Sequence, residues 1–132
     1  MPTSSPNPVA LALAAAEARL REIDPALPAE ALPHLRAAQE HLTDAIDEAM
    51  AAAITLQGTS LRAAGQLAGL SENAVGPRLA RTSLLAAYGS DAGRVTASGV
   101  ERARYDLEEG RHRPADETST PKPMRFRARR PS

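Results

Sequence analysis

The chain has 132 residues with 16 basic and 16 acidic side chains, and it is 42% hydrophobic but only 2% aromatic. The length fits one domain with tails, and the lack of cysteine excludes disulfides, thiolate metal sites and a cysteine nucleophile. Alanine supplies much of the apolar fraction and each buried methyl removes little area from water, so we expect a thin core that a partner subunit supplements.

The neutral total charge hides an uneven distribution along the chain. Residues 1–57 carry three basic and eight acidic side chains, residues 58–104 carry six basic and three acidic, and residues 111–132 carry seven basic and two acidic. A basic centre and a basic tail favour binding of a polyanion.

The N-terminal part predicts neither a membrane span nor a signal peptide. Its apolar run, Val9–Ala16, is too short to cross a bilayer and has no basic segment before it. We therefore expect a cytoplasmic protein with no membrane partner.

Residues 1–8 contain three prolines and no periodic apolar face, which predicts disorder. From Val9 to Ile23 apolar residues recur at steps of four and three, which predicts a helix. Asn7 can cap this helix, with Pro8 at its first position. Asp24-Pro25 ends it, because proline disfavours helical geometry in the preceding residue.

After a proline-rich connector, a second helix is predicted from about Pro33 to Leu56. Its apolar stripe consists of Leu35, Leu42, Ile46, Ala49, Met50, Ala53 and Ile54. The opposite, charged face is expected to be solvated and carries Arg36, Glu40, Asp44, Asp47 and Glu48. Residues 9–57 thus form a helical region that we expect to pair two copies into a homodimer.

No pattern in the sequence indicates catalysis or a cofactor. His34 and His41 are seven residues apart on one helix, about 10 Å along its axis, too far to share a metal ion. A site of His41, Asp44 and Glu48 is conceivable on spacing, but surface histidines are the better interpretation. We expect no enzyme activity, no cofactor and no metal.

The segment from Thr59 to Arg81 predicts a helix-turn-helix. Thr59 or Ser60 can cap a helix over Leu61–Ala68, and Gly69 can end it in a left-handed turn. Ser71 can cap a second helix, with Val75 and Leu79 directed to the core. A small residue, Gly65, precedes the turn glycine by four positions, where the two helices should cross closely.

The next residues predict a β-hairpin wing and a further helix. Tyr88 to Thr96 places two short apolar arms around a loop of turn residues, and Thr96 can cap a helix from about Ala97 to Glu108. The run Val95–Gly99, followed by a helix, resembles the end of the wing in MarR-like and PadR-like regulators, and the resemblance covers roughly residues 35–109. The resemblance implies a mainly α fold, a winged helix-turn-helix over residues 58–109, preceded by N-terminal helices, with disordered termini.

One feature departs from the resemblance, because Gly76-Pro77 lies inside the expected recognition helix. An interior proline costs roughly 3 kcal/mol, though less near the first turn. With Ser71 as cap, Pro77 is the sixth helical residue; with Asn73 as cap, it is the fourth. Neither residue can donate to a base from its side chain, which predicts weaker sequence readout than usual. Alternatively, the small Gly76 lets the backbone approach DNA closely.

Together, the resemblance and the charges imply that the protein binds double-stranded DNA and is associated with the nucleoid. They imply that it regulates transcription in a bacterium or its mobile elements. Bases would be read by the first residues of the recognition helix, and phosphates or bases by arginines. The candidate contacts are Ser60, Arg62, Ser71, Glu72, Asn73, Arg78, Arg81 and Arg94. Ser71 and Asn73 could instead only cap the helix.

Residues 110–132 hold four prolines and no periodic face, which predicts a disordered basic tail. Its cations could add sequence-independent affinity for DNA; they are Lys122, Arg125, Arg127, Arg129 and Arg130. An alternative function remains open: a protein-interaction or assembly module, such as an antitoxin, an adaptor or a small packaging subunit, would use the same helix pair to bind protein.

Overall fold

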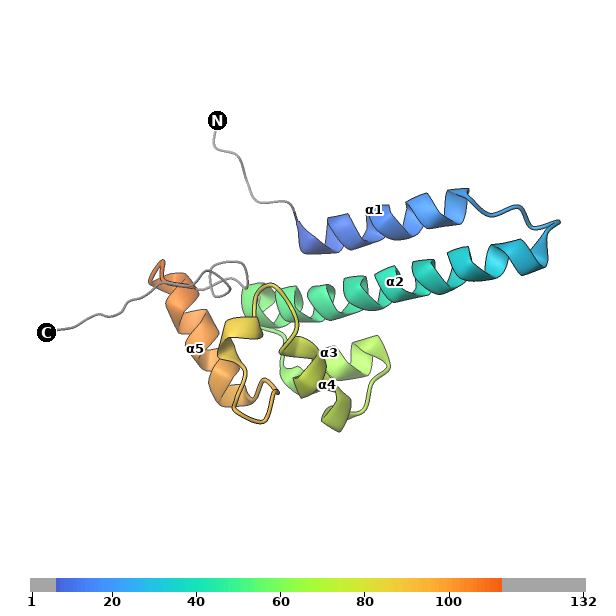
Figure 1. Ribbon diagram of the computed structural model, residues 1–132. Coiled ribbons are helices and arrows are strands. Elements are labelled where there is room, and N and C mark those ends of the chain that lie inside the picture. The colour runs from blue at the N-terminus through green and yellow to red at the C-terminus, as the bar shows by residue number, and fades with distance from the viewer. Residues whose placement is uncertain (1–6, 113–132) are drawn as a thin grey trace, which may run out of the picture. The chain divides into compact units, whose positions relative to one another are not determined.

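The computed structural model describes residues 7–112, and within this range it contains five α-helices and one 3-10 helix (Figure 1). The elements are α1 (Pro8–Arg21), α2 (Pro28–Gln57), α3 (Leu61–Ala68), α4 (Glu72–Leu79), η1 (Ala86–Tyr88) and α5 (Ala97–Glu108). The chain divides into two compact units, Met1–Met50 and Ala51–Ser132. The division falls within α2, seven residues before the boundary expected at residue 57.

The start of α1 confirms the predicted cap. The side chain of Asn7 accepts hydrogen bonds from the backbone N–H groups of Val9 (2.8 Å) and Ala10 (3.3 Å), and Pro8 is the first helical residue. The helix ends before Asp24, whose carboxylate accepts from the N–H of Ala26 at 2.9 Å. Disorder was predicted for residues 1–8: residues 1–6 lie outside the described residues, and for Asn7 and Pro8 the prediction was wrong, because they form the start of α1.

α2 begins at Pro28, so the prediction of a connector as far as Pro33 was wrong. Proline suits the first position of a helix, where its missing N–H would have no partner, and the N–H of Ala31 already donates to Leu27 (3.0 Å). Pro33 lies inside the helix. It removes one backbone hydrogen bond, which a helix of 30 residues tolerates.

In the first unit, α1 and the first part of α2 run antiparallel (Figure 1). Met50, at the end of this unit, is buried, but the other buried apolar side chains are small: Ala16 of α1 is 2% exposed, and Ala31, Ala38 and Ala45 of α2 are at most 5% exposed. We call these three residues of α2 the alanine seam. Their spacing of seven keeps them on one side of α2, so α1 covers alanine rather than the predicted leucine positions.

Asp47 was expected in the solvated face of α2, and this was wrong, because it is only 6% exposed. It precedes Ala51 by four residues and Ile54 by seven, and both of these are fully buried. Residues at these steps share one side of a helix, so Asp47 lies on the buried side.

The second unit has a core of larger side chains, with Ile54, Leu79 and Leu85 fully buried. Arg104 of α5 fastens the end of α2 to this core: its guanidinium donates twice to the carbonyl of Ile54 (2.8 and 3.0 Å) and once to that of Thr59 (3.1 Å). One side chain thus supplies hydrogen-bond donors to two backbone carbonyls at the end of α2.

The predicted β-hairpin wing is wrong, because residues 7–112 contain no β-strand. Tyr88, expected in the first arm, is the last residue of η1 and donates from its hydroxyl to Asp106 of α5 (3.0 Å). The loop is closed by a bond from Ser90 N–H to the Arg94 carbonyl (2.8 Å) and by one from Gly93 N–H to the Ser90 carbonyl (2.9 Å). With Tyr88 held against α5, no first strand forms, and the winged fold class is not correct.

α5 covers Ala97–Glu108, the predicted range, with Val100 and Ala103 buried. The described chain then turns back: the ring of His112 lies 5.2 Å from that of Tyr88, and Arg111 lies over Tyr105 at 5.5 Å. The rest of the predicted disordered tail, from residue 113, lies outside the described residues. Among the described helices none is both long and apolar enough to cross a membrane.

Candidate nucleic-acid interface

α3 begins where the sequence predicts, at a serine cap. The hydroxyl of Ser60 accepts from the backbone N–H of Ala63 at 3.0 Å. This bond satisfies one of the N–H groups that the first turn of a helix leaves without a partner. Ser60 was a candidate phosphate contact, and in the structure its hydroxyl caps α3.

Gly69 ends α3 in the left-handed conformation, with φ 75° and ψ 28°, as predicted. The N–H of Gly69 donates to the carbonyl of Gln66 (3.2 Å), and that of Leu70 to the carbonyl of Gly65 (2.8 Å). These two bonds form a Schellman motif, which closes the helix and redirects the chain into α4.

The crossing of α3 and α4 depends on Gly65. A Cβ atom at residue 65 would lie 2.7 Å from Cγ2 of Val75, closer than carbon atoms can approach. Val75 is 3% exposed and Leu79 is fully buried, as predicted. The absence of a side chain at residue 65 therefore lets the two helices meet at this point.

α4 begins at Glu72 with Ser71 as N-cap, so Asn73 is not the cap. The hydroxyl of Ser71 makes no capping bond. Ser71, Glu72 and Asn73 are all exposed, so the three residues predicted to meet bases lie together at the open N-terminus of α4.

Pro77 is the sixth residue of α4, and it has no N–H to donate to the carbonyl of Asn73. Gly76 is buried against the segment after η1: a Cβ here would lie 3.0 Å from both Nε of Arg94 and the carbonyl oxygen of Val95. The N–H of Val95 donates to the Gly76 carbonyl at 3.0 Å. The hypothesis that Gly76 lets the backbone approach DNA is therefore wrong, because Arg94 and Val95 cover it.

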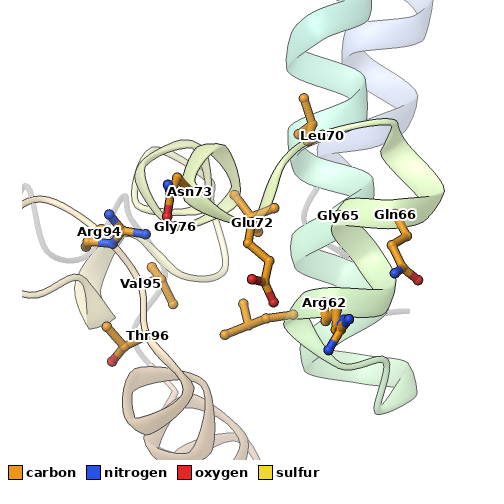
Figure 2. Close-up of a pocket in the computed structure, with 12 residues that line it drawn as sticks. Arg62, Gly65, Gln66, Leu70, Glu72, Asn73, Gly76, Arg94, Val95 and Thr96 are labelled. Carbon is orange, nitrogen blue, oxygen red and sulfur yellow. The ribbon is translucent and has the colours of Figure 1, made fainter.

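A groove of about 500 Å³ lies between α3, the start of α4 and residues 94–96 (Figure 2). Arg62 of α3 and Arg94 lie at opposite sides of it, and Glu72 points into it between them. Neither arginine has an ion-pair partner among the described residues. Two cations on the rim thus flank the exposed end of α4.

The sequence analysis did not predict Gln66 and Thr96 as contact residues, although both line the groove. Gln66 follows Arg62 by one helical turn, so the helical period alone could have found it. Thr96 was predicted as the cap of α5; it holds that position but makes no side-chain capping bond.

Arg78 and Arg81, predicted to face DNA, lie outside the groove lining. Arg78 is half-buried and Arg81 is exposed, and each already interacts with another group of the protein. The candidate interface therefore centres on Arg62 and Arg94. The basic tail residues Lys122, Arg125, Arg127, Arg129 and Arg130 lie outside the described residues.

The residues 7–112 contain no cluster of three or more His, Asp or Glu side chains able to hold a metal ion. Comparison of the chain with protein-family models, with curated proteins and with solved structures gives no match. Its function is therefore inferred from the geometry of α3, α4 and the groove.

Proposed function

We propose that the protein binds double-stranded DNA through α3 and α4 and acts as a regulator of transcription. The observation that supports this most is the helix pair itself: α3 and α4 cross at Gly65 and Val75 and leave the first residues of α4 exposed. A helix pair with this turn can insert the N-terminus of its second helix into the major groove while the first helix crosses the phosphate backbone.

The side chains at the start of α4 suit contact with bases. The amide of Asn73 can pair with adenine, and the carboxylate of Glu72 can accept from the amino group of cytosine. Pro77 lies one helical turn after Asn73 and offers no donor. Base readout would therefore be confined to about one turn of α4, which predicts modest sequence specificity.

Arg62 and Arg94 supply the phosphate contacts in this proposal. Both line the groove beside the start of α4, and neither is paired with a carboxylate of the described chain. Guanidinium groups displace counterions when they neutralise phosphates, so binding would weaken as salt rises. The side chain of Arg94 packs over Gly76, and this contact keeps Arg94 close to the side of α4 on which Asn73 lies.

The proposal is tested by titrating the full chain into a labelled random-sequence duplex at several salt concentrations, followed by anisotropy. We expect the double substitution Arg62→Ala with Arg94→Ala to weaken binding about tenfold or more, and to lower the slope of log affinity against log salt by about two. A matched control, Arg21→Ala with Arg36→Ala, removes two exposed arginines of the first unit. Equal effects of the two double substitutions would contradict the proposal.

One observation favours the alternative of a protein-binding module. Leu67 of α3 is 84% exposed, beside Gln66 of the groove lining, and the apolar surface of a protein partner would bury such a side chain more favourably than the charged phosphate backbone of DNA. If the chain fails to bind duplex at tens of micromolar in low salt, the helix pair is better explained as a protein-docking surface.

A further inference from the structure

α2 exposes a second line of apolar side chains, which α1 does not cover. Leu32, Leu35, Leu42 and Ile46 are 64%, 46%, 43% and 41% exposed; we call them the leucine stripe. Gln39 lies between Leu35 and Leu42 on the same side of α2. If it is included, successive members of the line are three, four, three and four residues apart. This is the heptad spacing by which helices pack side by side.

The leucine stripe and the alanine seam are two different sides of α2. At about 100° per residue, the stripe is centred about 90° around the helix from the seam. A helix in a four-helix bundle has two such sides, one for each neighbouring helix. Among the described residues of the first unit, 7–50, only the alanine side of α2 has a neighbouring helix.

α1 extends the same uncovered surface. Its Leu13 and Leu20 are 43% and 45% exposed, and they lie about 50° around α1 from the buried Ala16. Seen from the N-terminus of each helix, the exposed leucines of α1 and α2 are displaced in the same sense from the covered side. Because the two helices are antiparallel, a rotation in the same sense places the exposed leucines of both helices on the same side of the helix pair.

The exposed area is close to what a dimer requires. With Leu27, which is 47% exposed, seven large aliphatic side chains are involved, and at about half exposure they present on the order of 500 Å² of apolar surface. A standard interface buries about 800 Å² per partner, of which about 65% is apolar in homodimers. The stripe and its neighbours alone supply that apolar part.

The leucine stripe is also symmetric about Gln39. Leu32 and Ile46 lie seven residues to either side of it, and Leu35 and Leu42 lie four and three residues to either side. A twofold axis through Gln39 would place Leu32 opposite Ile46 of a second, antiparallel α2, and Leu35 opposite its Leu42. The amide of Gln39 both donates and accepts, so it can pair with its own copy on the axis.

We propose that a second copy of the chain covers the leucine stripe, with the two α2 helices antiparallel and Gln39 facing Gln39. The first units of the two copies then form a four-helix bundle. An interface of this symmetry requires one patch that is complementary to itself, and the stripe meets this requirement. The pairing involves only the first unit and does not depend on DNA binding.

The first test measures the mass of the full chain by light scattering over micromolar concentrations. We expect a dimer, and we expect Leu35→Lys with Leu42→Lys to weaken dimerisation by about 100-fold or more, because four charges would enter the apolar surface. Leu11→Lys is the control, since Leu11 is 58% exposed on the other side of α1. A monomeric wild-type protein would refute the pairing, as would a dimer that both sets of substitutions leave intact.

The second test determines the register and does not rely on a disruptive substitution. The chain has no cysteine, so Gln39→Cys introduces a single thiol that should form an intermolecular disulfide under mild oxidation if two copies meet at this residue. Asp44→Cys, on the opposite side of α2, is the matched control. Crosslinking that is no faster at residue 39 than at residue 44 would contradict the proposed register.

Discussion

Three glycines determine how closely elements approach one another in the second unit. A Cβ on Gly65 would meet Val75, one on Gly76 would meet Arg94 and Val95, and one on Gly99 would lie 2.5 Å from the carbonyl oxygen of Tyr88. The first is at the crossing of α3 and α4, the second holds the segment after η1 against α4, and the third seats the start of α5 on η1. At each of these three contacts, the absence of a side chain on glycine allows the close packing.

Gly65→Ala should lower the free energy of unfolding by about 1–3 kcal/mol, because the added methyl overlaps Val75 and a valine in a helix has one preferred rotamer. Urea unfolding followed by circular dichroism measures the change. Val75→Ala removes the atom that is struck, so the double variant should lose less than the two single variants combined. Strict additivity would show that the two residues do not meet.

An arginine that adds to the positive charge of a segment can still be used in hydrogen bonds that stabilise the fold. Arg104 contributes to the positive charge of residues 58–104, but its guanidinium is used on the carbonyls of Ile54 and Thr59. Arg78 and Arg81 likewise have partners within the protein. Charge counts therefore overestimated the number of arginines that DNA could use, and Arg62 and Arg94 remain the strongest candidates.

Among the elements, α4 is the least regular. It has eight residues, buries Val75, Gly76 and Leu79, and carries Pro77 on its exposed side. The proline leaves the carbonyl of Asn73 without its helical donor, while the Gly76 carbonyl accepts from both Ala80 (3.2 Å) and Val95 (3.0 Å). Tertiary hydrogen bonding thus supports a helix that local propensity disfavours.

Pro77→Ala should raise the free energy of unfolding by about 1–2 kcal/mol, because the restored N–H can bond to Asn73 and alanine favours the helix; the lost rigidity of the unfolded chain offsets part of the gain. Thermal and urea unfolding measure it. Pro28→Ala is the control, since Pro28 is the first residue of α2, where proline loses no hydrogen bond. A gain at residue 28 equal to that at residue 77 would contradict this account.

At the scale of the whole molecule, the two compact units bury different kinds of side chain. The first buries mainly alanine and leaves its leucines exposed, whereas the second buries Ile54, Leu79 and Leu85 completely. Burial of alanine stabilises a fold only weakly. The first unit therefore gains most from a second copy, and the second unit has a core that supports α3 and α4, the helices proposed to bind DNA.

If a second copy stabilises the fold, the midpoint of thermal unfolding should rise with protein concentration, because dimerisation draws the equilibrium toward the folded state. A series from about 1 to 100 micromolar, followed by circular dichroism, measures the shift. The variant with Leu35→Lys and Leu42→Lys should show a lower midpoint and no such dependence. A wild-type midpoint that is constant over this range would contradict dimer-linked stability.

The sequence by itself determined where most helices begin and end. Asn7 with Pro8, Ser60, Gly69 and Thr96 mark boundaries that the structure reproduces. At Asn7, Ser60 and Gly69 the hydrogen bonds involved join groups within five residues of one another, and at Thr96 the boundary is reproduced although its side chain makes no capping bond. The crossing of Gly65 with Val75 followed from the same local pattern.

Only the tertiary structure decided the structural roles of Tyr88, Arg104 and Gly76. Tyr88 became part of a helical turn because its hydroxyl bonds to Asp106, 18 residues later, and Arg104 became structural because it bonds to Ile54, 50 residues earlier. Gly76 was covered by Arg94 in the same way. These outcomes depend on which distant groups meet once the chain is folded, and a period or a local cap carries no information about them.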